Sequence, residues 1–166
     1  MMRVGSVSGK LRLLMLMLTL VLGGTAAEAG DCERSMKLGS MKAFAEMVSV
    51  GVKELALSST LSAAELENLR DDARAIAEQY DVRLYEEDDL LVTDLFPHDI
   101  AVGKKVLLIY KGDTLEKYLA LKSTKAAWVE AGEYDEQARA SLARDFGRLL
   151  SYPDESIDRM LSPEQP

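Results

Sequence analysis

The sequence predicts a mostly helical α+β fold: a single small domain with about five helices and a two- to three-stranded sheet. Three observations support this class. Two stretches with apolar residues at helical spacing come first, a short β-prone region follows, and three further helical stretches come last. Strands and helices do not alternate, so the order argues against a doubly wound parallel sheet. We expect residues 30–166 to form one compact acidic domain, with residues 162–166 as a loose tail.

The first helix is predicted from about Ser35 to Leu57. Its apolar residues fall three or four positions apart and therefore share one face of a helix. They are Met41, Phe44, Ala45, Val48, Val52 and Leu55. Because few charged residues interrupt this stretch, we expect a central helix that is covered on more than one side.

A second helix is predicted to begin after Ser62 and to end near Tyr80. Ser62 and Glu65 have the spacing of a capping box, in which each side chain bonds the backbone of the other residue. One face of this helix is apolar and the other is charged. The apolar residues are Leu66, Leu69, Ala73, Ile76, Ala77 and Tyr80. The pattern predicts a solvated amphipathic helix packed on the first one.

The periodicity changes in the middle of the chain. Residues 82–85 alternate between apolar and polar, as in a half-buried strand. Residues 90–96 are expected to form a second short strand or an extended segment. Residues 106–110 are continuously apolar and β-prone, which predicts an inner strand. Residues 111–113 then provide a turn.

Three helices are predicted in the C-terminal part. The first follows a capping arrangement of Asp113 with Glu116 and ends before Gly132, a residue typical of helix C-termini. The second spans about Tyr134 to Leu150. A short final helix begins after Pro153.

The first 29 residues have the layout of a cleaved secretory signal. A basic head comes first, with Arg3, Lys10 and Arg12. An apolar run from Leu13 to Leu22 follows, and Ala27-Glu28-Ala29 supplies small residues at the spacing of a cleavage site. The run is shorter than the roughly 20 residues that span a bilayer. We therefore expect a periplasmic or secreted protein, cleaved after Ala29, with no transmembrane helix in the mature chain.

The charge of the chain is acidic. The net charge is −8 for the whole sequence, and it becomes −10 when residues 1–29 are removed. Such a field repels phosphate backbones, so nucleic acid is not expected as a partner, whereas a basic protein or a cationic ligand is favoured. The candidate binding surface is a run of four acids. These are Glu86, Glu87, Asp88 and Asp89. A solvated loop that protects a sheet edge is the simpler interpretation of the run.

The residues suited to catalysis are few. His98 is the single histidine, and it lies close in sequence to Asp94 and Asp99. These three residues are the alternative candidates for acid–base catalysis. One histidine cannot form a three-histidine zinc site. The methionines of the first helix are read as core residues rather than copper ligands. We expect no metal and no cofactor.

Cys32 is the only cysteine, so an internal disulfide is excluded. Attachment of a lipid at Cys32 is an alternative because the residue lies just beyond the export signal. However, Asp31 stands where a bacterial lipoprotein signal has a small residue. The preferred interpretation is a free cysteine near a flexible new N-terminus that sometimes forms an intermolecular disulfide.

Together these features predict an exported, non-catalytic binding protein with an acidic surface. An inhibitor, an immunity protein or an accessory subunit of a basic partner would fit this description. The alternative is a small exported hydrolase or lyase that uses the carboxylates near His98. A lipid anchor at Cys32 is compatible with either function.

Overall fold

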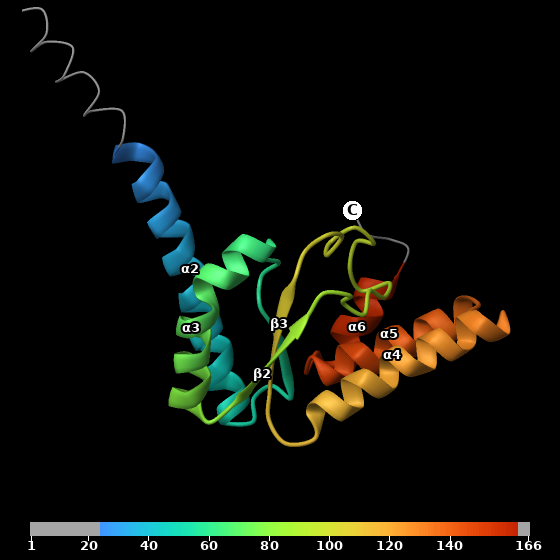
Figure 1. Cartoon of the computed structure of the whole chain (residues 1–166). Coiled ribbons are helices and arrows are strands. Elements are labelled where there is room, and N and C mark those ends of the chain that lie inside the picture. The colour runs from blue at the N-terminus through green and yellow to red at the C-terminus, as the bar shows by residue number, and fades with distance from the viewer. Residues whose placement is uncertain (1–23, 163–166) are drawn as a thin grey trace, which may run out of the picture. The chain divides into compact units, whose positions relative to one another are not determined.

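The computed structural model describes residues 24–162. Within this range the chain forms five helices and one three-stranded antiparallel sheet, which confirms the predicted mostly helical α+β class (Figure 1). The described residues divide between Met36 and Lys37 into two compact units, and the sheet with its cores belongs to the second. The predicted signal core at residues 1–23 and the tail residues 163–166 lie outside the described residues. None of the described helices is long and apolar enough to cross a membrane.

The strand β3 is the centre of the sheet. The helices are α2 (Gly24–Ser49), α3 (Ala63–Tyr80), α4 (Thr114–Ala131), α5 (Glu136–Leu149) and α6 (Asp154–Leu161), and the strands are β1 (Leu55–Leu57), β2 (Arg83–Glu87) and β3 (Val106–Tyr110). The strand order is β1-β3-β2, and β3 pairs antiparallel with both neighbours. All five residues of β3 are buried, as the continuous apolar run predicts.

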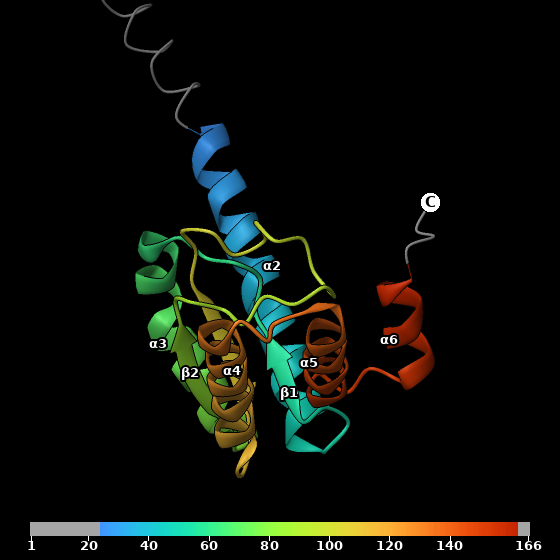
Figure 2. The same ribbon diagram turned by 90° about the vertical axis from the view of Figure 1, so that its right-hand side faces the viewer.

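Helices cover both faces of the sheet. Because side chains alternate along a strand, Leu107 and Ile109 of β3 enter one core, and Leu108 and Tyr110 enter the other. Residues 37–49 of α2 and the helix α3 complete the first core. The helices α4 and α5 complete the second, and they lie in front of the sheet in Figure 2. The helix α6 packs on α5 through Ile157.

The capping box of α3 is present as predicted. The hydroxyl of Ser62 accepts a hydrogen bond from the backbone N–H of Glu65 at 3.3 Å, and the carboxylate of Glu65 accepts from the backbone N–H of Ser62 at 2.7 Å. Lys37 of α2 forms an ion pair with the same carboxylate. The buried residues of α3 are Leu66, Leu69, Ala73 and Ala77. The predicted amphipathic helix is therefore confirmed.

The predicted end of the first helix is wrong. The helix α2 ends at Ser49, and Gly51 has a φ of +79°, which closes the helix with a turn. Residues 55–57 then form β1, because pairing with residues 108–110 satisfies the backbone of one side of β3. Leu55 is buried, as predicted, but from a strand and not from a helix.

The middle and C-terminal segments also differ in detail from the prediction. Residues 90–93 have no regular secondary structure, turns follow at residues 94–95 and 98–103, and no strand lies between β2 and β3, so the predicted strand at residues 90–96 is absent. Asp113 makes no side-chain capping bond, because its backbone is not extended and its carboxylate instead forms an ion pair with Lys117. The next helix is capped by Asp135, whose carboxylate accepts from the backbone N–H of Ala138 at 2.9 Å.

Replacement of Gly147 tests the packing between α5 and α6. A Cβ atom at this position would lie 2.8 Å from Cγ1 and Cδ1 of the buried Ile157. Overpacking of this kind costs about 1–3 kcal/mol, which exceeds the roughly 1 kcal/mol that alanine gains over glycine in a helix. We expect Gly147→Ala to lower the free energy of unfolding in urea. The matched control is Gly39→Ala in α2, where the added Cβ meets no atom within 4 Å; it should stabilise the protein. Equal effects of the two substitutions would contradict tight packing at Gly147.

The carboxylate of Glu65 makes stability depend on pH. The hydrogen bond from Lys37, followed by those from Ser62, lowers the pKa of Glu65 from 4.5 to about 2. A lowered pKa in the folded state contributes stability above pH 4.5, and this contribution is lost as the pH falls toward 2. Glu65→Gln should therefore destabilise the protein in urea at about pH 7 and much less at about pH 3. The control is Glu46→Gln, an exposed residue of α2. If Glu65→Gln lowered the free energy of unfolding by the same amount at both pH values, this assignment would be contradicted.

Candidate functional site

A β-bulge interrupts the pairing of β1 with β3. Residues 55–57 pair with residues 110–108, and the next bridge joins Leu61 to Lys105. Between these pairs, residues 58–60 on the β1 side face only residues 106–107 on the β3 side. The extra residue defines a bulge at residues 58–60. The backbone N–H of Ser58 donates to the carbonyl of Leu107 at 2.9 Å, but the N–H of Leu107 donates to the hydroxyl of Ser58, also at 2.9 Å. The side chain of Ser58 thus replaces a backbone carbonyl in the ladder.

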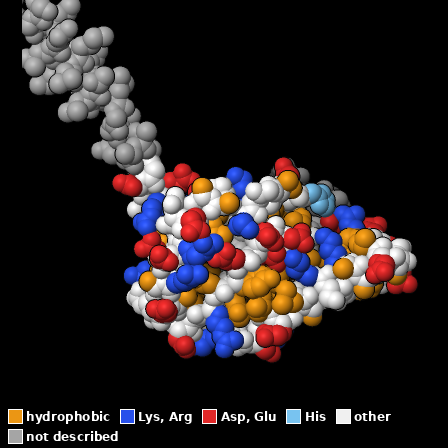
Figure 3. All heavy atoms as spheres, viewed as in Figure 1, with side chains coloured by type: hydrophobic (Ala, Val, Ile, Leu, Met, Phe, Trp, Pro, Cys, Tyr) orange, Lys and Arg blue, Asp and Glu red, His pale blue; other side chains and the backbone are white. Residues whose placement is uncertain are grey.

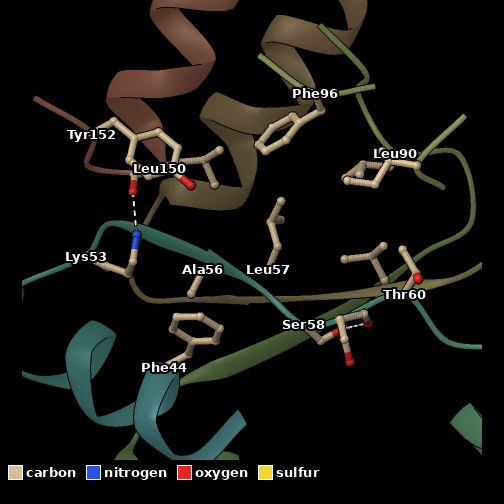
Figure 4. A pocket seen from close by; sticks show the side chains of 13 residues that line it. Phe44, Lys53, Ala56, Leu57, Ser58, Thr60, Leu90, Phe96, Leu150 and Tyr152 are labelled. Atoms are coloured by element: carbon tan, nitrogen blue, oxygen red, sulfur yellow. Dashed lines mark hydrogen bonds between the residues drawn. The ribbon is translucent and has the colours of Figure 1, made fainter. Parts of the chain in front are cut away.

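A pocket of about 510 Å³ lies beside β1 and this bulge (Figure 4). It is lined by Phe44, Lys53, Ala56, Leu57, Ser58, Ser59, Thr60, Leu90, Phe96, Ile100, Val106, Leu150 and Tyr152. Figure 4 shows Leu57 near the middle, with Phe44 and Phe96 on opposite sides. Ser58 and Thr60 lie toward one end, and Lys53 lies at the other. The pocket is therefore largely apolar and has polar groups at its ends, as is typical of sites for small ligands.

Lys53 lies where β1 approaches the end of α5. Its ammonium donates to the carbonyl of Leu150 at 2.6 Å and lies 5.3 Å from the centre of the Tyr152 ring. Burial lowers the pKa of Lys53. The end of α5 is a Schellman motif, in which the backbone N–H groups of Ser151 and Tyr152 bond back to the last turn of the helix.

Ser151 fixes this end of the pocket. It occupies the left-handed position of the Schellman motif, with a φ of +63° where glycine is usual. Its hydroxyl accepts a hydrogen bond from the backbone N–H of Glu54 at 2.9 Å. This bond explains the use of serine at a strained position, because it ties the end of α5 to the start of β1.

The lining of the pocket carries little charge. Of its 13 lining residues, Lys53 is the only charged one, and the lining contains no histidine, cysteine or carboxylate. Across residues 24–162, no group of three His, Cys, Asp or Glu side chains is placed to hold a metal ion. The lining can exclude water from an apolar ligand and can place one positive charge against it.

The acidic run does not form one solvated loop. Glu86 and Glu87 belong to β2, and Glu87 is only 3% exposed. The hydroxyl of Tyr118 donates to Glu87 at 2.9 Å, and the ammonium of Lys122 lies 3.0 Å from the same carboxylate. Because β2 alternates its side chains, Glu87 points into the core between the sheet and α4. It is not available as part of a binding surface.

The other three acids of the run each have a cationic partner. Arg70 of α3 binds Glu86 through two hydrogen bonds, of 2.8 and 3.1 Å, and lowers the pKa of that carboxyl. Asp88 lies 3.5 Å from Lys105, and Asp89 lies 3.4 Å from Lys122. Figure 3 shows acidic and basic side chains interspersed on this face. That these acids bind a partner remains a prediction.

The alternative catalytic residues do not come together with the pocket. Asp94 accepts a hydrogen bond from Arg139 of α5 at 2.8 Å. His98 and Asp99 are both exposed, on the turns that follow Phe96. This segment contributes Phe96 and Ile100 to the pocket, but none of the three predicted catalytic residues lines it.

Cys32 is exposed and lies within α2, so the helix extends over the segment that was expected to be flexible. The predicted cleavage position after Ala29 also falls within the residue range of α2. Lipid attachment and export remain predictions.

Sequence reasoning missed the pocket. Its residues come from segments far apart in the chain, and Lys53 was assigned to the interior of a helix. The sequence does contain one usable signal: three hydroxyl residues in a row, 58–60, directly after the short apolar segment 55–57. This pattern is compatible with a short strand that ends in a bulge.

No protein-family model matches the chain, and no curated protein or solved structure matches it either.

The buried hydroxyl of Tyr118 anchors the segment after β2, which supplies Leu90 and Phe96 to the pocket. It accepts a hydrogen bond from the backbone N–H of Leu91 at 3.0 Å while it donates to Glu87. Tyr118→Phe leaves both groups buried without this partner, at a cost of about 1–3 kcal/mol. We expect this loss in urea unfolding, together with faster amide hydrogen exchange at Leu91.

The matched control for this prediction is Tyr85→Phe. Tyr85 packs against the same core, and within residues 24–162 its hydroxyl has no hydrogen-bond partner. Tyr85→Phe should lower the free energy of unfolding by much less than Tyr118→Phe. If Tyr118→Phe were as stable as the parent protein, the hydroxyl would not anchor Leu91.

Proposed function

We propose that this chain is an exported, non-catalytic binding protein and that its ligand occupies the pocket beside β1. The observation that carries the proposal is the pocket of about 510 Å³ with mainly apolar walls and a single charged residue, Lys53. Pockets of this size and composition are typical of sites that bind small ligands. Export rests on the sequence pattern of residues 1–29.

A binding role is supported by what lines the pocket. Catalysis of hydrolysis or elimination needs a group that accepts or donates a proton within hydrogen-bond reach of the substrate. The carboxylates near His98 do not line the pocket, and Asp94 is held by Arg139. The lining itself offers hydroxyl groups and one ammonium but no carboxylate or imidazole to act with them, and this set of groups suits orientation of a ligand.

The acidic surface is a weaker candidate for the binding site. An inhibitor, immunity protein or accessory subunit would need free carboxylates to attract a basic partner. Each acid of the run from Glu86 to Asp89 already lies near a cation of the same chain. If a basic partner replaced these internal ion pairs with its own, the free energy of binding would gain little, since exposed pairs contribute about 0–1 kcal/mol.

Two substitutions in one segment test the pocket. Ile100 lines the pocket and is 41% exposed, whereas Val102 is 73% exposed and does not line it. Ile100→Glu should weaken the binding of a neutral apolar dye, N-phenylnaphthylamine, by about tenfold, because it removes part of the apolar wall. Val102→Glu, which adds the same charge nearby, should leave the affinity unchanged. The measurement is a fluorescence titration.

Two outcomes would contradict the proposal. The first is that the dye does not bind the parent protein at all. The second is that both variants lose affinity equally, because a general effect of charge would then explain the loss. The stability of each variant in urea shows that it remains folded.

A further inference from the structure

The ammonium of Lys53 is the only charge in the pocket, and it lacks an opposite charge. An ammonium has three N–H donors. Within residues 24–162, its one hydrogen bond is to the carbonyl of Leu150, and no carboxylate lies within 4.0 Å of it. Its neighbour Glu54 lies 3.5 Å from the ammonium of Lys117. Two donors of a partly buried cation are therefore available to a ligand.

A structural role accounts for only part of this arrangement. A cation beside the last carbonyl groups of a helix is favourable, and Lys53 is so placed at the end of α5. Yet that role uses one donor, and burial still disfavours the charged form, as the lowered pKa of Lys53 indicates. An anionic group would offset the burial and would complete the hydrogen bonds of the ammonium.

The rest of the pocket suits a hydrocarbon chain. Between Lys53 at one end and Thr60 toward the other, the walls are formed mainly by apolar and aromatic side chains, among them Phe44, Leu57 and Phe96 (Figure 4). An extended strand rises about 3.3 Å per residue, so the seven-residue step from Lys53 to Thr60 can span at most roughly 23 Å, and the bulge at residues 58–60 shortens it. A long alkyl chain is similar in length.

A peptide fits the same pocket less well. An added strand would need a row of N–H and C=O groups along the free edge of β1. The strand β1 has three residues, and the bulge at residues 58–60 breaks the pattern directly afterwards. Most amide groups of a bound peptide would face apolar side chains, which costs free energy unless they find partners.

We propose that the pocket binds a single-chain carboxylic acid of the fatty-acid class. Its carboxylate would contact Lys53 beside Tyr152, and its hydrocarbon chain would lie along β1 toward Thr60. This inference rests on the proposed binding function and specifies the class of ligand. The net charge of −8 opposes the approach of an anion only weakly, because physiological salt screens charges beyond about 8 Å.

The first experiment is calorimetric titration of the full chain with saturated fatty acids from octanoate to palmitate, and with the alcohols of the same chain lengths. We expect each added methylene to tighten binding by roughly fourfold until the pocket is filled. We expect each acid to bind about tenfold or more tightly than its alcohol, because only the acid forms a charge-assisted bond with Lys53.

The second experiment compares two lysines with matching contacts. Lys125 donates to the carbonyl of Val92 at 2.8 Å and lies 5.6 Å from the centre of the Tyr134 ring, but it does not line the pocket. Lys53→Met should remove the preference for the acid over the alcohol. Lys125→Met should retain it, and Lys53→Arg should restore most of it because the charge is kept.

The outcomes separate the two proposals. If acids and alcohols bind equally, or if Lys53→Met keeps the preference, the inference fails while the proposed binding function stands. If neither series binds and the neutral dye does not bind either, both fail. If an apolar peptide binds and the fatty acids do not, the ligand class is overturned.

Discussion

Burial of the central strand β3 on both faces is the constraint on which the rest of the structure depends. Its five residues are apolar, so each face must be covered, and three strands alone cannot cover it. The helix α3 and residues 37–49 of α2 bury one face, and α4 and α5 bury the other. Because β3 is joined to its neighbours by antiparallel pairing, β1 and β2 become the two edges. The pocket lies at the first of these edges.

The second edge brings a carboxylate into the core. The register places Glu87 opposite Val106, on the face that α4 covers. A buried carboxylate is tolerated only when it is paired and hydrogen-bonded. Tyr118 and Lys122 of α4 provide both, and the same tyrosine hydroxyl accepts from the backbone of Leu91. This network holds the segment after β2 against α4, and that segment supplies Leu90 and Phe96 to the pocket. The position of one buried acid thus shapes a wall of the candidate site.

Local patterns were predictable from the sequence, and features that depend on partners distant in the chain were not. The inner strand at residues 106–110 and the capping box at Ser62 follow from short-range patterns, so sequence reasoning found them. Residues 55–57 have no strand signature of their own and become β1 only because β3 offers an unpaired side. The burial of Glu87 depends on the same kind of distant pairing. The pocket combines α2, β1, the bulge, the segment after β2 and the end of α5, and no local pattern contains all of these elements.

The bulge shows how the fold leaves space at an edge without losing a buried hydrogen bond. If the chain simply left the ladder after Leu57, the backbone N–H of Leu107 would be buried without a partner, which proteins avoid. The hydroxyl of Ser58 accepts that hydrogen bond instead, and the carbonyl of Leu107 still accepts from the backbone of Ser58. The backbone can therefore turn away at residues 59–60 while β3 stays fully paired on this side. The end of α5 is fastened to the other end of β1 by Ser151 in the same manner, through a side-chain hydroxyl and a backbone N–H. Two serines thus fix both ends of a short strand, and the pocket lies along the strand between them.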